Sequence, residues 1–91
     1  MLHVENTTQF KRDLKLSKKR GCDLAALNNI MNLIEYEKPL SPKLKDHPLM
    51  GAWVGHRELH INPDWLLVYK ILPKEKVVIF VRTGTHSDLF D

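Results

Sequence analysis

A run of five apolar residues near the C-terminus constrains the fold more than any other feature of this sequence. Val77, Val78, Ile79, Phe80 and Val81 stand shortly after a turn signal at Pro73 and Lys74. Successive side chains of a β-strand point to opposite faces, so a strand that is apolar throughout has to be covered on both faces. The run therefore predicts a central strand over residues 77–83.

The segment before this strand is typical of a β-hairpin. Residues 53–61 and 65–72 are separated by Asn62, Pro63 and Asp64. Proline presets the backbone angle of a turn, and Asn and Asp tolerate turn geometry. We expect two paired strands with Asp64 at the tip. Alternation then puts His56, Glu58 and His60 on one face of their strand, and Arg82 on the same face as Phe80 and Val78.

The amino-terminal part of the chain predicts a short strand followed by two helices. Met1 to Glu5 alternates weakly, and Asn6, Thr7 and Thr8 offer oxygens that can cap a helix running to Gly21. Asp23 can cap a second helix, whose apolar residues recur at helical spacing: Leu24, Leu27, Met31 and Ile34. Because the connection is tight, we expect an antiparallel helical hairpin.

These elements predict an α+β fold for one domain over residues 1–91. The amino-terminal strand and the helical hairpin pack on one face of a small, mainly antiparallel sheet, which leaves the other face free for a site. Trp53 and Trp65 are both of a type that is usually buried, and we expect Trp53 in the core. No stretch resembles a signal peptide or a membrane helix, so we expect a cytoplasmic protein.

Composition sets limits on the partners and on the site. The net charge of +3 and the pI of about 9.1 mildly favour acidic partners such as nucleic acid. Cys22 is the only cysteine, so neither an internal disulfide nor a cysteine-rich zinc site can form. Three or four histidines with Asp64 would suit zinc, but no helical His-x-x-x-His pattern supports such a site, and we expect no cofactor.

The C-terminal half also concentrates side chains suited to cleaving a phosphodiester without a metal. Imidazoles and carboxylates exchange protons near neutral pH, and a guanidinium binds phosphate oxygens through paired hydrogen bonds. Aromatic rings next to them can stack on bases. The predicted catalytic set is His47, His60, Asp64, Arg82 and His86, and the predicted substrate-binding aromatics are Trp65 and Phe90.

The same residues resemble the YafQ branch of the RelE-type toxins of bacterial toxin–antitoxin pairs. The resemblance covers nearly the whole chain and is most specific in the C-terminal tail. Its motifs are Lys45-Asp46-His47-Pro48-Leu49, Trp53 with Gly55 and Arg57, His60 with Pro63-Asp64-Trp65, Tyr69-Lys70, and Arg82-Thr83-Gly84-Thr85-His86 with Leu89-Phe90.

The resemblance implies a metal-independent endoribonuclease that cuts mRNA in the ribosomal A site and is inhibited by a cognate antitoxin. The 2′-hydroxyl of the ribose attacks the adjacent phosphorus after a base takes its proton. His86 is the expected acid, either His60 or Asp64 the base, and His47 orients the others or shares the proton transfer. Arg82 is expected to stabilise charge on the phosphoryl oxygens.

Two other functions are compatible with such a fold. One is a non-enzymatic, ParE-like inhibitor of a protein such as DNA gyrase, and the other is a plain RNA-binding module. An inhibitor has no need for His60, Asp64, Arg82 and His86 together, and an RNA-binding module would explain the charge but leave the histidines without a role. The basic end of the first helix, Lys18, Lys19 and Arg20, is either a solvated face or a contact to 16S rRNA of the ribosome. The free toxin is expected to be monomeric.

Overall fold

The structure is a computed structural model and describes residues 1–90. Five strands form one sheet in the order β1-β5-β4-β3-β2, in which β1 is parallel to β5 and the other pairs are antiparallel. The strands are β1 (His3–Asn6), β2 (His47–Pro48), β3 (Arg57–Asn62), β4 (Trp65–Leu72) and β5 (Val77–Gly84). The helices are α1 (Thr8–Lys19), α2 (Leu24–Glu35) and α3 (His86–Phe90), with short 3-10 turns η1 (Pro42–Leu44) and η2 (Gly51–Trp53).

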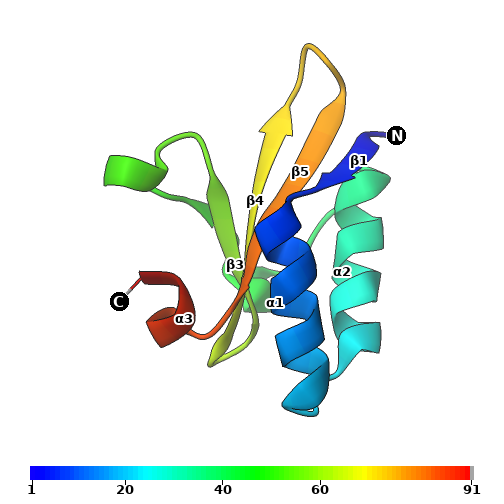
Figure 1. Cartoon of the computed structure of the whole chain (residues 1–91). Coiled ribbons are helices and arrows are strands. Elements are labelled where there is room, and N and C mark those ends of the chain that lie inside the picture. The colour runs from blue at the N-terminus through cyan, green and yellow to red at the C-terminus, as the bar shows by residue number, and fades with distance from the viewer. Residues whose placement is uncertain (91) are drawn as a thin grey trace.

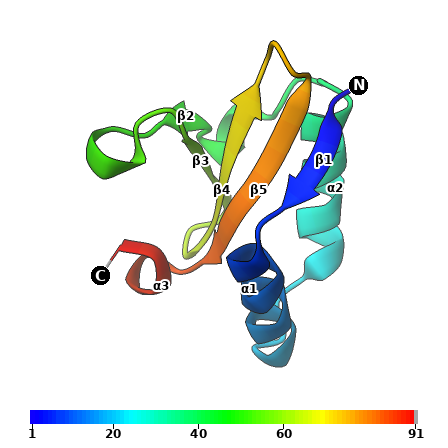
Figure 2. The same ribbon diagram turned by 45° about the horizontal axis from the view of Figure 1, so that its top comes forward.

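The two long helices cover one face of this sheet, and α3 lies on the opposite side (Figures 1 and 2). We call the side opposite α1 and α2 the open face. No helix within residues 1–90 combines the length and the apolar character needed to cross a membrane. The predicted α+β arrangement is confirmed, with the difference that the amino-terminal strand forms an edge of the sheet beside β5 and does not pack on its face.

The helical hairpin begins and ends where local chemistry predicts. The Thr7 hydroxyl accepts a hydrogen bond from the Phe10 backbone N–H, and the Asp23 carboxylate accepts one from that of Ala26. Each such cap stabilises its helix by about 1 kcal/mol. Gly21 has a φ of +76°, which lets the chain reverse between α1 and α2.

Two apolar clusters pack against the sheet, one on each face. The main core lies between the sheet and the two long helices, and within it the rings of Phe10 and Phe80 stack with centroids 5.9 Å apart. The smaller cluster on the open face consists of Leu66, Val68 and Leu89 with Leu49, Trp53 and Val81 around them. The β5 run therefore contributes to both clusters, and its predicted place in the interior of the sheet, between β1 and β4, is confirmed.

The start of β3 was predicted wrongly. The strand begins at Arg57 rather than at Trp53, because Trp53 belongs to a 3-10 turn and Gly55 has a φ of +89° that interrupts an extended strand. Trp53 lies in the turn η2 and packs half-buried against the smaller cluster, not in the main core. The expectation for Trp53 is therefore corrected.

The expected face of Arg82 was also wrong, because β5 contains a β-bulge. Tyr69 pairs with Phe80, whereas its neighbour Val68 pairs with Arg82, so Val81 is an extra residue in the ladder. Directly paired side chains share a face of the sheet. Phe80 is therefore on the helical face with Tyr69, and Arg82 is on the open face with Val68.

Candidate active site on the open face of the sheet

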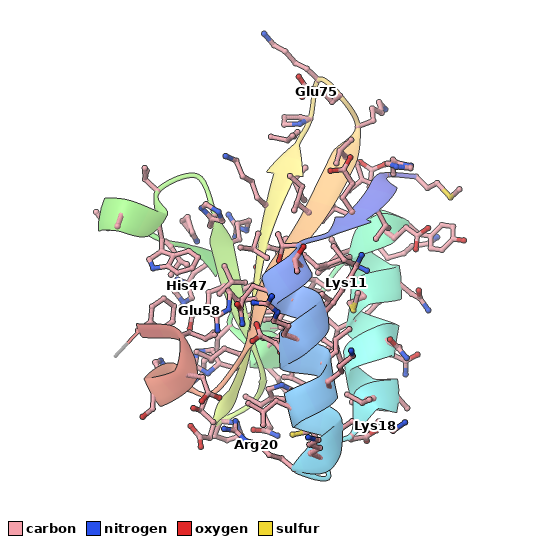
Figure 3. All side chains as sticks on the ribbon, in the orientation of Figure 1. Lys11, Lys18, Arg20, His47, Glu58 and Glu75 are labelled. Atoms are coloured by element: carbon pink, nitrogen blue, oxygen red, sulfur yellow. The ribbon has the colours of Figure 1, made fainter. Side chains whose placement is uncertain are left out.

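Three histidines surround one carboxylate on the open face. Glu58 and His60 come from β3, His47 comes from β2 directly opposite Glu58, and His86 begins α3. The Glu58 Oε1 atom lies 3.6 Å from His60 Nε2 and 4.0 Å from His86 Nε2. The rings of His60 and His86 are 5.9 Å apart between centroids. Figure 3 shows His47 next to Glu58.

Glu58 was not among the predicted site residues. Its exposed fraction is 4%, so its carboxylate has little contact with water. A buried carboxylate requires partners that donate hydrogen bonds or carry positive charge. The side chains within ion-pair distance of Glu58 are His60 and His86. The alternation that placed Glu58 between His56 and His60 already put it on the correct face, but a glutamate in a strand gives no sign of being buried.

Arg82 is held by a carboxylate from α1, which lies along the outer edge of β5 beyond the end of β1, where the Thr83 backbone N–H also meets it. Its Nε and Nη2 atoms donate to the two oxygens of Asp13 at 2.8 and 3.3 Å. Asp13 is 6% exposed and also accepts a hydrogen bond from the Thr83 backbone N–H at 3.1 Å. Val68 pairs with both Glu58 and Arg82, so these two side chains lie in one row across β3, β4 and β5. Neighbouring strands are ~4.8 Å apart, which puts the two backbones about 10 Å from each other.

His47 is fixed by the residue that precedes it. The Asp46 carboxylate accepts hydrogen bonds from Arg57 Nε and Nη2 at 3.1 and 3.0 Å and from the Tyr69 hydroxyl at 2.6 Å. Burial and the hydrogen bond to Asp46 raise the pKa of Tyr69, so the hydroxyl stays a donor. The His47 Nδ1 atom lies 3.0 Å from the Pro48 carbonyl oxygen. A carbonyl can only accept, so a hydrogen bond here needs a proton on Nδ1.

The short helix α3 carries His86 and is held at three points. Thr85 and Asp88 cap each other, with the Thr85 N–H donating to Asp88 Oδ2 at 2.9 Å and the Asp88 N–H donating to Thr85 Oγ1 at 3.1 Å. Arg20 at the end of α1 pairs with Asp88 at 2.6 Å, and Leu89 enters the smaller cluster. A helix of this length does not form by itself in water, so these contacts position His86.

This arrangement changes the interpretation of Arg20. The residue was expected to belong to a basic surface with Lys18 and Lys19, but its guanidinium is occupied by Asp88. Lys18 and Lys19 are exposed in the last turn of α1. Figure 3 shows Lys18 and Arg20 at the same end of α1.

We predict that acid loosens α3. The hydrogen bond from Arg20, followed by that from the Thr85 N–H, lowers the pKa of Asp88 from 3.8 to about 2. Because the folded pKa lies below the unfolded one, the contribution is complete above pH ~4 and is lost as the pH falls through about 2. The Trp53 indole signal in NMR reports on α3, since its ring lies 5.7 Å from that of Phe90.

The matched control is Asp88→Asn. In this variant the Trp53 indole signal should already resemble the low-pH state at neutral pH and should change little on acidification. A wild-type signal that stays constant down to pH ~2 would show that the ion pair does not position α3.

Asp64, another residue of the predicted catalytic set, makes no polar contact with the histidines in the part of the chain that the structure describes. Asp64 is exposed in the β3–β4 turn, where its N–H donates to Asn62 Oδ1 at 3.0 Å, and no hydrogen bond or ion pair within residues 1–90 joins its carboxylate to the histidines. The pKa of Arg20 is raised mainly by its hydrogen bond to Asp88 and in small part by the charge of Asp64.

The two aromatic residues of the predicted set lie in different surroundings. Trp65 is 4% exposed in the main core, so its ring cannot stack on a base in this conformation, and its Nε1 has no hydrogen-bond partner within the described chain. Phe90 is 37% exposed and lies 6.0 Å from the His86 ring and 5.7 Å from the Trp53 ring. Phe90 is thus the ring next to His86, and Trp53, rather than Trp65, is the indole beside Phe90.

A sheet covered by a helical hairpin on one face and carrying histidines, a carboxylate and an arginine on the other is the arrangement of the small α+β toxins of bacterial toxin–antitoxin systems. Residues 2–91 match the family described as bacterial toxin of type II toxin-antitoxin system, YafQ. The chain belongs to this family.

Similar proteins agree with this assignment. The mRNA interferase toxin YafQ of Escherichia coli K12 is 44% identical over 88 residues, which cover 96% of this chain and 94% of that protein. A metal-bound toxin from Helicobacter pylori has a TM-score of 0.92 at 46% identity, covering 99% of this chain and 100% of its own. YafQ in the E. coli DinJ–YafQ complex has a TM-score of 0.89 at 42% identity, with both chains fully covered.

Proposed function

We propose that this chain is an endoribonuclease that cleaves mRNA. The observation that carries the proposal is the pair of imidazoles, His60 and His86, that approach the buried Glu58 carboxylate, with Arg82 in the same row of the sheet as Glu58. Two imidazoles at this separation can serve one phosphodiester as base and acid. The name of the E. coli relative, an mRNA interferase, supports the same activity.

In the proposed mechanism His60 takes the proton from the ribose 2′-hydroxyl. The 2′-oxygen attacks the adjacent phosphorus, the bond to the 5′-oxygen breaks, and His86 protonates that leaving oxygen. Arg82 stabilises the negative charge on the phosphoryl oxygens with the guanidinium N–H groups that Asp13 does not engage. Glu58 orients both imidazoles, and His47 supports His60 from β2.

The geometry favours His60 over Asp64 as the base. His60 shares Glu58 with His86, whereas Asp64 lies in the exposed β3–β4 turn. In this mechanism Asp64 contributes only its negative charge. Trp65, which is buried in the main core, anchors the β3–β4 turn that carries Asp64. Phe90, together with Trp53, offers a partly exposed aromatic surface on which a base can stack.

We further propose that the reaction needs no metal, because proton transfer and charge stabilisation are both supplied by side chains. His47, Glu58 and His60 nevertheless present ligand atoms that lie within 4.8 Å of one another, and the H. pylori relative was crystallised as a metal-bound toxin. A metal bound by these three residues would occupy the imidazole lone pairs that the mechanism uses.

We therefore predict that a chelator leaves cleavage unchanged and that added Zn²⁺ or Cu²⁺ lowers it. The check is a cleavage assay after dialysis against EDTA, followed by titration with each metal. A His47→Gln variant, which removes one ligand, should need a higher metal concentration for the same inhibition. Loss of activity on chelation, restored by metal, would overturn the metal-independent mechanism.

The partners follow from the same comparison. A cognate antitoxin is expected, as in the DinJ–YafQ complex, and an acidic or amphipathic segment of it would cover the open face. We propose that cleavage takes place in the ribosomal A site, with Lys18 and Lys19 contacting 16S rRNA. Arg20 contributes less to this surface because Asp88 already binds it.

Reversing the charges of Lys18 and Lys19 is expected to weaken ribosome binding and to flatten its dependence on salt. Removing one lysine–phosphate interaction reduces the slope of log affinity against log salt by about 0.7 to 0.9. Sedimentation with 70S ribosomes at several salt concentrations measures both quantities. The matched control is Lys74→Glu with Lys76→Glu in the exposed β4–β5 turn. Equal affinity for wild type and the Lys18 and Lys19 variant would remove this face from the interaction.

The proposed activity is tested by adding purified protein to a translating bacterial extract that contains one defined messenger. New RNA ends in frame with codons, absent with a folded His86→Ala variant, would support a ribosome-linked nuclease. No new ends with folded wild-type protein would overturn the proposal and would lead to a topoisomerase assay for the inhibitor function.

A further inference from the structure

A hollow of about 460 Å³ opens next to His60 at the edge of the sheet. The strand β2 pairs only with Arg57 and Glu58, so the later part of β3 has no neighbouring strand on that side. The segment around η1 lies there instead and forms the opposite wall. The hollow is lined by Lys43, Leu44, Lys45, His60, Ile61, Asn62 and Pro63.

The walls of this hollow are built by defined local structure. The Ser41 hydroxyl accepts a hydrogen bond from the Lys43 N–H, and the Lys45 N–H donates to the Pro42 carbonyl at 3.1 Å. Lys45 adopts a left-handed backbone conformation with a φ of +54°. Leu44 and Ile61 pack against the main core, so the apolar floor is anchored to the rest of the protein.

The lining combines the chemistry that a nucleotide requires. An apolar floor of Leu44, Ile61 and Pro63 suits the flat surface of a base, and the ammonium groups of Lys43 and Lys45 suit a phosphate. Asn62 Oδ1 accepts the Asp64 backbone N–H, so the amide –NH₂ group of Asn62 remains available as a donor. The volume falls in the range of ~300–1,000 Å³ typical of small-molecule sites.

We propose that this hollow is a subsite for the nucleotide on the 5′ side of the cut. The proposal rests on the proposed function, in which His60 takes the proton from the 2′-hydroxyl of that nucleotide. Because His60 forms part of the wall, the base attached to the same ribose enters the hollow. Lys43 and Lys45 bind the phosphate that precedes it, and the Asn62 amide donates to an acceptor on the base edge.

Binding is tested first without catalysis. Each of the four ribonucleoside 3′,5′-bisphosphates, which carry the preceding phosphate on the 5′ side and a phosphate where the scissile group would lie on the 3′ side, is titrated into ¹⁵N-labelled protein. The expected result is shifted amide signals in residues 43–45 and 60–62. These shifts should weaken with Lys43→Ala and Lys45→Asn combined, because asparagine tolerates the left-handed backbone but lacks the charge.

The matched control is Lys74→Ala combined with Lys76→Asn. These lysines lie in the β4–β5 turn, and Lys76 has a comparable φ of +56°. The control removes equal charge at an equal backbone geometry, and Figures 1 and 3 show this turn, with Glu75 labelled, at the opposite end of the sheet from α3. In this control variant the amide signals of residues 43–45 and 60–62 should shift on titration as they do in the wild-type protein.

Cleavage then tests the use of the subsite. The Lys43 and Lys45 variant should raise the KM for mRNA about tenfold, with kcat changed far less, because the reacting groups are untouched. Asn62→Ala should alter which base is found 5′ of the cut. If wild type cleaves, but the Lys43 and Lys45 variant has the KM of the control and Asn62→Ala cuts at the wild-type sites, the subsite is overturned. Absence of cleavage by wild type would instead overturn the proposed function. The NMR titration would then still show whether the hollow binds a nucleotide.

Discussion

Replacing His86 by alanine is expected to lower the rate of mRNA cleavage by roughly 10²–10⁴-fold, the usual contribution of a general acid. His86 is positioned to protonate the leaving 5′-oxygen, since its ring lies 5.9 Å from that of His60 and its Nε2 lies 4.0 Å from Glu58. The side chain is 57% exposed, so its removal should leave the fold unchanged. The measurement is the single-turnover rate on a defined messenger in a translating extract.

His86→Gln is a suitable companion variant because glutamine preserves much of the volume and can form hydrogen bonds, but it cannot donate an acidic proton. Both variants should show the circular dichroism spectrum and the melting temperature of wild type. A folded His86→Ala protein that cuts at the wild-type rate would exclude His86 from the mechanism and would leave His47 as the imidazole to test next.

Arg82→Ala is expected to lose both activity and stability. Removal of the guanidinium should lower cleavage by roughly 10²–10³-fold, since charge on the phosphoryl oxygens is no longer stabilised. It also leaves the Asp13 carboxylate, 6% exposed, without its cation. Breaking a buried pair in this way costs about 3 kcal/mol of unfolding free energy. The contact with Asp13 therefore gives Arg82 a role in stability as well as in cleavage.

A second substitution separates the two roles of Arg82. Combining Arg82→Ala with Asp13→Asn removes the unpaired charge, and the Asn side chain can still accept the Thr83 N–H. Urea unfolding should therefore show recovery of most of the lost stability, while cleavage stays as low as in the single variant. Recovery of cleavage together with stability would mean that Arg82 acts only through the fold.

The fold shows how far local patterns extend. The caps at Thr7 and Asp23, the helical spacing of α2 and the turn at Asn62, Pro63 and Asp64 are all decided by residues within a few positions of one another. Such short-range chemistry is visible in a sequence. The motif from Arg82 to His86 is equally local, and the family that it indicates is the one to which the chain belongs.

The site shows where local patterns end. Glu58 is distinguished by its burial among three histidines, which no neighbouring residue indicates, and the faces of Trp53 and Trp65 do not follow from residue type. In the same way, Arg20 resembles part of a basic surface in the sequence, but Asp88, 68 residues away, binds it. These contacts join segments that are distant in the chain, and nothing near each residue encodes its partner.

The sequence by itself therefore determined the order and type of the elements, the two-sided packing of β5 and the family of this protein. The tertiary structure decided which side chains meet. One extra residue, Val81, in the β5 ladder moves Arg82 from the helical face to the open face. Side chains alternate at every step of a strand, so a single bulge reverses the face of every residue after it, and only the pairing with β4 shows where that reversal occurs.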